Sequence, residues 1–255
     1  MGDWSADAIS GGLKAILGPE IEPVAVYLLP PGATPAPFDG YRSLIHHRYC
    51  QALMRARRGE SVRLEPDELA CPAAASAFGF RPLPAQLASG KGLVGFGIAD
   101  HESTGQRMFE GMTRLAAGEI GGIAACPLVA APRIPDVVIV EARPEPVMWL
   151  VLADLILAGG ARRHADTAVL QAACVDSTII PYREGRLNFA LGCYGCREST
   201  DLEAAEMVVG FPGSHLDGLL GALRYLGDKA VPRSRAKAAF YHLEEGGADR
   251  PGGSR

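Results

Sequence analysis

Residues 136–160 read "DVVIVEARPEPVMWLVLADLILAGG" and place two kinds of buried element next to each other. The first part, residues 137–142, is rich in β-branched side chains, which predicts a buried strand. Residues 145–158 are apolar on nearly every side, which predicts a buried helix. They contain Asp154 and are shorter than the roughly 20 residues that a membrane span needs. A strand and a helix therefore share one core, and the chain mixes α and β structure.

The rest of the chain continues this mixture without a regular strand–helix–strand rhythm. Further strands are expected at 23–29, 93–98, 121–130 and 206–212, and helices at 4–17, 43–58, 103–117, 167–174, 200 onward and 214–226. Residues 177–191 read as a strand–turn–strand centred on Glu184 and Gly185. We therefore expect an α+β fold, with a mixed, largely antiparallel sheet and packed helices in a single globular unit.

Composition limits the possible classes of protein. The chain has 255 residues, 48% of them hydrophobic, which suffices for one α+β domain over residues 1–227. Residues 228–255 turn basic and then Gly-rich, which predicts a mobile tail. The net charge of -4 argues against a nucleic-acid partner. With no membrane span or signal-peptide pattern, a cytoplasmic protein is expected, and it could form a homo-oligomer.

Common catalytic signatures are missing from the sequence. There is no phosphate-binding P-loop pattern, and "GLVGFG" at 92–97 lacks the glycine spacing of a dinucleotide fingerprint. Ser214 follows Gly213 and precedes an apolar helix, so we interpret it as a helix cap. The side chains that remain as candidates for chemistry are mainly cysteines.

The chain has six cysteines, and Cys193 and Cys196 form a C-x-x-C in "LGCYGCREST", residues 191–200. Alone the motif is weak, because a four-cysteine zinc site normally shows a second C-x-x-C and the chain has none. His46 and Cys50 are four residues apart and would share one face of the helix expected at 43–58. A metal or catalytic pair is one interpretation, and a core cysteine beside a surface histidine is the favoured one.

Four cysteines stand at the ends or breaks of expected elements, among small residues: Cys50, Cys71, Cys174 and Cys193. Four dispersed thiolates could hold an iron–sulfur cluster, and they could equally be inert core residues. Polar side chains follow Cys174 and Cys193, namely Asp176, Asn188 and Arg197. An arginine beside a cysteine would lower its pKa or hold an anionic ligand, whereas the alternative for Arg197 is a solvent-facing role.

Several segments together resemble the family called domain of unknown function 169 (uncharacterised ArCR). They are "ELACPAAASAFGF" at 68–80, "ACVDSTIIPYREGRLNFALGCYGCREST" at 173–200 and "EMVVGFP" at 206–212, with further blocks in the same order upstream. The resemblance covers about residues 10–226. It matches the four cysteines and also Pro72, Pro181, Asn188, Gly192, Gly195, Arg197 and Gly210.

The sequence departs from the family pattern in two places. Ala73 and Ala74 stand where the family tends to have glycines, and Cys196 stands where it usually has a smaller residue without a thiol. The resemblance therefore implies that Cys50, Cys71, Cys174 and Cys193 belong together and that Cys196 is an addition. It implies a site without an established reaction.

The leading hypothesis is a cysteine-ligated iron–sulfur or other metal-cofactor protein with a redox or cofactor-handling role. Its metal ligands would be the four cysteines, with three polar residues around the cofactor or substrate: Asp176, Asn188 and Arg197. A small-molecule substrate or a redox partner protein would then be its partner. One alternative is a metal-free thiol enzyme with Cys193 or Cys174 as nucleophile. Another is a small-molecule binding module whose cysteines are structural.

Overall fold

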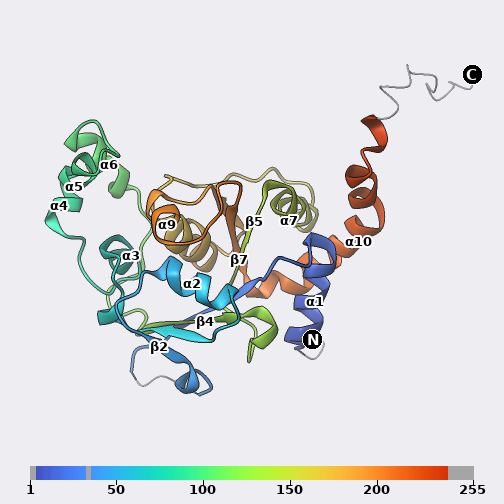
Figure 1. Cartoon of the computed structure of the whole chain (residues 1–255), viewed down its shortest axis with the longest axis horizontal. Coiled ribbons are helices and arrows are strands. Elements are labelled where there is room, and N and C mark those ends of the chain that lie inside the picture. Colours follow the sequence, from blue (N-terminus) through green and yellow to red (C-terminus); the bar gives the residue numbers. More distant parts are fainter. Residues whose placement is uncertain (1–3, 33–35, 241–255) are drawn as a thin grey trace, which may run out of the picture.

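The computed structural model describes residues 4–32 and 36–240. Within these residues, seven strands form one open sheet in the order β2-β3-β4-β1-β5-β7-β6 (Figure 1). The strands β2 and β3 are paired in parallel, and the other pairings are antiparallel. The expected α+β fold with a mixed, largely antiparallel sheet and packed helices in one unit is confirmed.

The strands are β1 (Val24–Leu29), β2 (Arg42–Leu44), β3 (Val62–Leu64), β4 (Gly122–Pro127), β5 (Val137–Ala142), β6 (Asn188–Ala190) and β7 (Met207–Pro212). The α-helices are α1 (Ala6–Leu17), α2 (Tyr49–Arg57), α3 (Pro72–Ala77), α4 (Ala85–Ala88), α5 (Lys91–Gly95), α6 (Glu102–Glu110), α7 (Pro144–Leu157), α8 (Ile180–Glu184), α9 (Tyr194–Ser199) and α10 (Leu216–Arg235). A π-helix spans Ala172–Ile179, immediately before α8.

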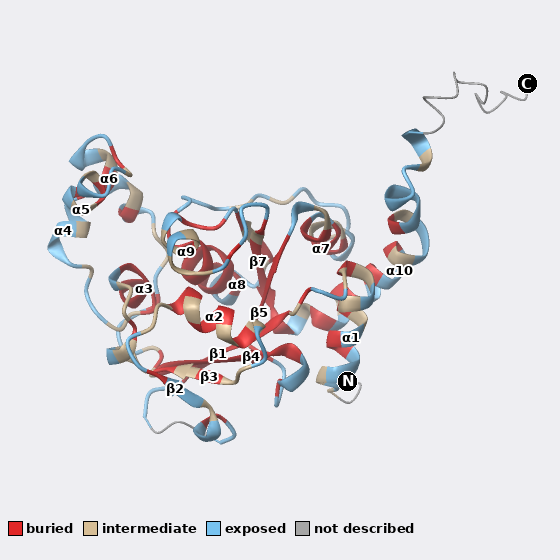
Figure 2. Cartoon of the chain, viewed as in Figure 1, coloured by how far each residue is buried: buried red, intermediate tan, exposed pale blue. Residues whose placement is uncertain are grey.

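The central strands are buried on both faces, and successive side chains point into two different cores. In β1, for example, Val26 packs into one core and Tyr27 into the other. The first core lies under α2, α3 and the π-helix, and the second lies under α1, α7 and α10. Figure 2 shows that the buried residues concentrate on the strands and on the helix faces turned toward them. Burial on both faces explains why these strands read as continuous apolar runs.

A third, smaller group of helices lies beyond α3, at one end of the molecule (Figure 1). The helices α4, α5 and α6 pack on one another around Leu93 and Phe109. The segment 93–98 was expected to be a strand, and this prediction is wrong. Leu93 and Val94 are helical because they pack against the neighbouring helix rather than against the sheet.

The start of another predicted helix also differs from the structure. The helix expected at 43–58 begins at Tyr49, because residues 42–44 form β2 and pair with β3. His46 therefore lies before the helix, with a left-handed backbone (φ 52°), and does not share a helix face with Cys50. The shared helix face is thus wrong, whereas the favoured interpretation, a core cysteine and a surface histidine, agrees with a buried Cys50 and an exposed His46.

The segment 167–191 also folds differently from the prediction. The expected helix 167–174 and the first strand of 177–191 are replaced by the π-helix and α8, with β6 as the strand that follows. Pro181 lies in the first turn of α8. Thr200 ends α9 by donating to the Cys196 carbonyl (2.6 Å) and does not open a new helix.

The helix α10 continues past the expected end at Leu226 to Arg235. The expected tail is described as far as residue 240, and residues 241–255 lie outside the described part. Across the described ranges, no helix combines the length and apolar character that crossing a bilayer requires.

Candidate functional site

Five cysteines from four separate segments line one cavity of about 290 Å³, which we call the cysteine pocket. They are Cys50, Cys71, Cys174, Cys193 and Cys196. The four cysteines chosen from the sequence are therefore brought together although they are far apart along the chain, and Cys196 joins them. Cys126 lies in the core under the opposite face of the sheet. All six thiols are free.

Helix starts position two of these cysteines. Cys50 lies in the first turn of α2, and Cys71 is the N-cap of α3. Pro72 occupies the first turn of α3, so the chain changes direction at Cys71 and enters the helix immediately. Both side chains therefore lie at a helix end rather than along a packed helix face.

The π-helix positions Cys174. π-helices are rare and occur frequently at functional sites. Just before this one, Val169 and Gln171 have left-handed backbones with φ of 54° and 56°, which is unfavourable for residues other than glycine. Within it, Thr178 donates to the Ala173 carbonyl (2.7 Å) and shares a hydrogen bond with the Tyr49 hydroxyl (2.8 Å). These bonds attach the π-helix to α2, which carries Cys50.

The sheet holds the π-helix from the other side. A Cβ atom at Gly210 in β7 would lie 1.7 Å from the Ser177 carbonyl oxygen, so a side chain at that position is impossible without movement of the backbone. Ser177 also donates from its hydroxyl to the Val208 carbonyl (3.3 Å). The glycine allows the π-helix to rest directly on the backbone of β7, and this contact fixes the depth of Cys174.

Cys193 and Cys196 lie on either side of the start of α9. Cys193 is the N-cap, and its Sγ accepts a hydrogen bond from the Cys196 amide (3.2 Å). The two Sγ atoms are 3.0 Å apart. The sequence placed this C-x-x-C between a strand and a helix expected from Thr200 onward, whereas in the structure it lies at the start of a helix itself. Cys196 therefore belongs to the pocket, whereas the sequence left it outside the predicted set.

The pocket favours protonated thiols. Burial and the nearby sulfurs of Cys71 and Cys193 raise the pKa of Cys174 well above its ordinary value. Contact with Cys196 and burial raise the pKa of Cys193. For Cys196, the contact with Cys193 lowers the pKa, but contact with Cys50 and burial outweigh it and raise the pKa to about 12. At neutral pH these thiols hold their protons unless a positive charge enters the pocket.

The polar residues predicted around the site lie behind the cavity wall: Asp176, Asn188 and Arg197, all in the described part, are outside its lining. Asn188 donates to the carbonyls of Asp166 (2.9 Å) and Asp176 (2.8 Å). The Asp176 carboxylate accepts from the Thr167 hydroxyl (2.9 Å), and burial raises its pKa to about 7. These bonds hold the loop before the π-helix, and direct contact with a cofactor or substrate remains a prediction.

Arg197 fastens the loop that carries the C-x-x-C. Its guanidinium donates to the carbonyls of Leu191, Glu203 (2.7 Å) and Glu206 (2.8 Å). These donors are directed at backbone oxygens of the loop rather than at the Cys193 sulfur. Arg197 therefore supports the pocket by holding the backbone on both sides of α9.

The remaining wall of the cysteine pocket is apolar. It is formed mainly by the helices α4–α6 and the segment before the π-helix, through Leu87, Leu93, Phe96, Ile98, Phe109 and Leu170. Arg48 and Glu198 supply charges to the lining, with 3.7 Å between the Arg48 Nη1 and a Glu198 carboxylate oxygen. Because residues 93–98 were interpreted as a strand, the sequence did not predict this wall.

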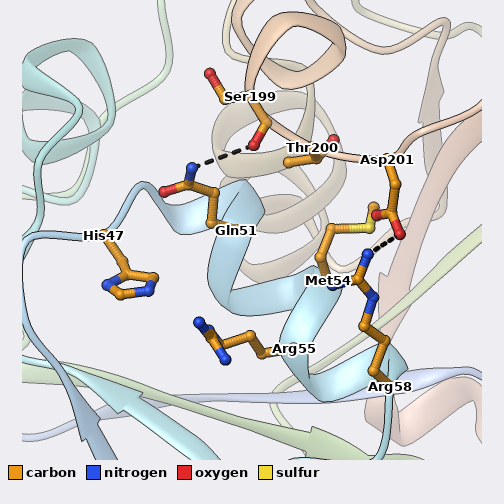
Figure 3. A pocket seen from close by; sticks show the side chains of 8 residues that line it. All are labelled: His47, Gln51, Met54, Arg55, Arg58, Ser199, Thr200 and Asp201. Atoms are coloured by element: carbon orange, nitrogen blue, oxygen red, sulfur yellow. Dashed lines mark hydrogen bonds and ion pairs between the residues drawn. The ribbon is translucent and has the colours of Figure 1, made fainter.

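A polar cavity of about 400 Å³ borders the same helix α2 (Figure 3). It contains three basic side chains, but Arg58 is paired with Asp201 and Arg55 with Glu60 (3.0 Å). Gln51 donates to the Ser199 carbonyl (3.1 Å), as the dashed line in Figure 3 shows. This bond joins α2 to α9, so the two helices that carry Cys50 and Cys196 are fastened together.

A third cavity, of about 760 Å³, contains a buried charge cluster that the sequence did not predict. Arg57, at the end of α2, contacts Glu206 (2.5 Å) and Glu141 in β5 (3.5 Å). Burial raises the pKa of Glu141 to about 7, although the charge of Arg57 opposes the shift. Burial also acts on Glu206, but hydrogen bonds from Arg57 and from the Glu203 amide hold its pKa below the ordinary value. The sequence signal for this cluster is Glu141, a charged residue within the otherwise apolar run of β5.

Within the described part of the chain, the pocket does not contain a ready site for a single metal ion. Over residues 4–32 and 36–240, no three side chains of the His, Cys, Asp or Glu type are arranged to hold one metal ion. The cysteines of the pocket share a cavity without forming such a closed set.

Comparison with known proteins places the chain in a family and gives it no reaction. A family described as DUF169, uncharacterised ArCR, matches residues 12–222. An uncharacterized protein of Methanocaldococcus jannaschii is 30% identical over 190 residues, which cover 73% of this chain and 81% of that protein. No solved structure matches the chain.

Proposed function

Because the chain belongs to the DUF169 family, whose description names no activity, we propose a function from the site itself: the cysteine pocket holds a thiolate-ligated metal cofactor, with an iron–sulfur cluster as the leading candidate. Its ligands would be Cys50, Cys71, Cys174 and Cys193. The convergence of these thiols from four segments on one cavity carries the proposal. Iron–sulfur clusters are held by four such thiolates.

Electrostatics supports a positively charged occupant. Burial raises the pKa of Cys174, and the neighbouring sulfurs raise it further because several thiolates in one small cavity repel one another. A metal centre removes this penalty, since it displaces the thiol protons and neutralises the thiolates. Without it, Cys174, Cys193 and Cys196 are neutral thiols with raised pKa values, and such thiols are poor nucleophiles.

A single metal ion has no ready site among the described residues. A tetrahedral zinc ion with bonds of about 2.3 Å sets its sulfurs about 3.8 Å apart. The described residues contain no three-residue group arranged in that way. A cluster with several metal atoms accepts ligands that surround a larger volume, as the thiols around this cavity do.

The apolar wall suggests how the cofactor would be used. Leu93 and Phe109 shield one side of the pocket, and the hydrophobic surroundings of a metal site control solvent access and redox potential. The proposed role is redox chemistry or cofactor handling, with a small-molecule substrate or a redox partner protein. A cytoplasmic location and a possible homo-oligomer remain part of this proposal.

The thiol-enzyme alternative has weaker support. It needs Cys193 or Cys174 as a thiolate, activated by Arg197. The pKa of each thiol is raised, and the Arg197 guanidinium donates to backbone carbonyls. Reactive cysteines normally have lowered pKa values in electropositive surroundings. We therefore rank the metal cofactor first.

The test is anaerobic reconstitution with ferrous iron and sulfide, followed by iron and sulfide analysis and visible absorbance. The wild-type protein should become coloured and retain both elements. Cys174→Ser should lose most of the absorbance, whereas Cys126→Ser should keep it, because Cys126 is an equally buried cysteine on the opposite side of the sheet. A colourless, iron-free wild-type protein would refute the proposal, as would equal losses in the two variants.

A further inference from the structure

We propose that Cys193 and Cys196 form a reversible disulfide, so that the cysteine pocket contains a two-electron redox switch in addition to its ligands. The C-x-x-C is then a modification site. Its effect on cofactor loading rests on the function proposed above, whereas formation of the disulfide does not. The oxidant is a small disulfide that enters the pocket.

Geometry places this pair ahead of the other possible pairs. The Sγ atoms of Cys193 and Cys196 are 3.0 Å apart, and a disulfide needs about 2.05 Å, so closure requires a movement of about 1 Å. The two residues are three positions apart at the start of α9, and the chain between them already turns. Rotation of the two side chains can therefore close the bond while the helix stays in place.

The raised pKa values of both thiols slow the exchange at neutral pH, so the reaction is run in an alkaline buffer, where one local contact assists it. The Cys193 Sγ accepts the Cys196 amide hydrogen (3.2 Å), which stabilises negative charge on that sulfur while a proton leaves. Both sulfurs line the cavity, although each residue is less than a tenth exposed. A small reagent that enters the pocket thus meets both sulfurs.

The chemistry balances as two successive exchanges. In the first, one thiol of the pair loses its proton and attacks the small disulfide, which forms a mixed disulfide and releases one small thiol. In the second, the other thiol loses its proton and attacks the protein sulfur of that mixed disulfide. The protein loses two hydrogens and is oxidised by two electrons, and the small disulfide is reduced to two thiols.

The consequence follows from the role of Cys193 as a proposed ligand. In the disulfide this sulfur is no longer available as a thiolate, so a cluster would keep three ligands instead of four. Reconstitution should therefore depend on the redox state of the pair. Cys196 is the residue that adds this control, since it lies beside a proposed ligand without being one.

The experiment uses the full-length, metal-free protein, reduced and then treated anaerobically with hydroxyethyl disulfide. Intact-mass measurement should show loss of two hydrogens with no retained adduct, and peptide mapping should join Cys193 to Cys196. In Cys196→Ala the internal bond should not form, and any exchange should stop at a mixed disulfide. Cys126→Ser is the matched control and should behave as the wild type does.

Treated and untreated protein are then reconstituted with ferrous iron and sulfide. The treated protein should lose most of the absorbance that the untreated protein gains, and a dithiol reductant should restore it. Retained adducts on the wild type, or a disulfide that maps to other cysteines, would overturn the switch, and so would full loading of the oxidised protein. If neither sample loads iron but the mapped disulfide forms, the cluster proposal fails and the disulfide stands.

Discussion

The buried carboxylate of Glu141 leads to a quantitative prediction. Burial raises its pKa from 4.5 to about 7 in the folded protein, while the unfolded chain returns it to the ordinary value. A group whose folded pKa is raised stabilises the fold fully below the unfolded pKa, and this stability is lost as the pH rises through the folded pKa. For Glu141 the window runs from about pH 4.5 to about pH 7.

The magnitude follows from the size of this shift. One pKa unit corresponds to about 1.4 kcal/mol, so the full shift corresponds to about 3 kcal/mol. Between pH 5 and pH 8 the linkage relation gives a loss of about 2 to 3 kcal/mol. Glu141→Gln keeps the size of the side chain and removes the titration. We therefore expect the free energy of unfolding of this variant, relative to wild type, to rise by about that amount between the two pH values.

The assay is urea unfolding at a series of pH values, with the same cofactor loading in both proteins. Glu206→Gln is the matched control, because Glu206 contacts the same Arg57 but has a lowered pKa. Its contribution to stability is present above the ordinary pKa and is lost as the pH falls, so the sign reverses. This variant should be less stable than wild type at pH 8, and the difference should shrink toward pH 4. A flat profile for Glu141→Gln, or the same sign in both variants, would refute the reasoning.

Three further outcomes are expected. Gly210→Ala should lower the free energy of unfolding by about 3 kcal/mol or more and reduce iron retention, because its Cβ would overlap the Ser177 carbonyl. The control is Gly221→Ala, which has open space around it and should raise the free energy of unfolding by up to about 1 kcal/mol in the same urea titration. Arg197→Lys should lower the thermal midpoint and the iron content, because a compact ammonium group cannot reach the three carbonyls that the planar guanidinium spans. The control Arg183→Lys lies in an exposed ion pair and should change neither. Iron loading of the cysteine pocket should release protons from the thiols with raised pKa values, and iron should bind more tightly as the pH rises. Calorimetry in buffers of different ionisation enthalpy measures the number of protons released. Loading without proton release would contradict the assignment of these thiols as ligands.

Much of the fold could be predicted because its central strands are buried on both faces. Residues 137–142 and 207–212 appear in the sequence as nearly continuous apolar runs, which are typical of strands that are buried on both faces. The failures occur where a short segment is decided by distant contacts. Leu93 is helical because of its packing in the small core with Phe109, and the π-helix exists because Gly210 allows close approach to β7. Local sequence periodicity does not predict the contact with Phe109 or the contact with Gly210.

For the site, too, the sequence predicted which residues belong together but not how they contact one another. The family resemblance grouped four cysteines, and the structure brings them to one cavity, but spacing alone contained no information on their contacts. The contact of Arg57 with Glu141 and Glu206 joins residues far apart in the sequence, so only the folded chain reveals it. Arg197 was expected to act on a thiol or an anion, since an arginine beside a cysteine suggests that role. Its position between two loop segments instead directs it at carbonyls.

Cys196 links these observations. By the resemblance, most of the family has a small residue without a thiol at this position, so the four-cysteine ligand set would be shared and the fifth thiol would be particular to chains like this one. The Sγ of Cys196 lies 3.0 Å from the Sγ of Cys193, close enough for the proposed disulfide to form. The two proposals can therefore be tested separately: Cys196→Ala should prevent the disulfide and leave the four proposed ligands in place.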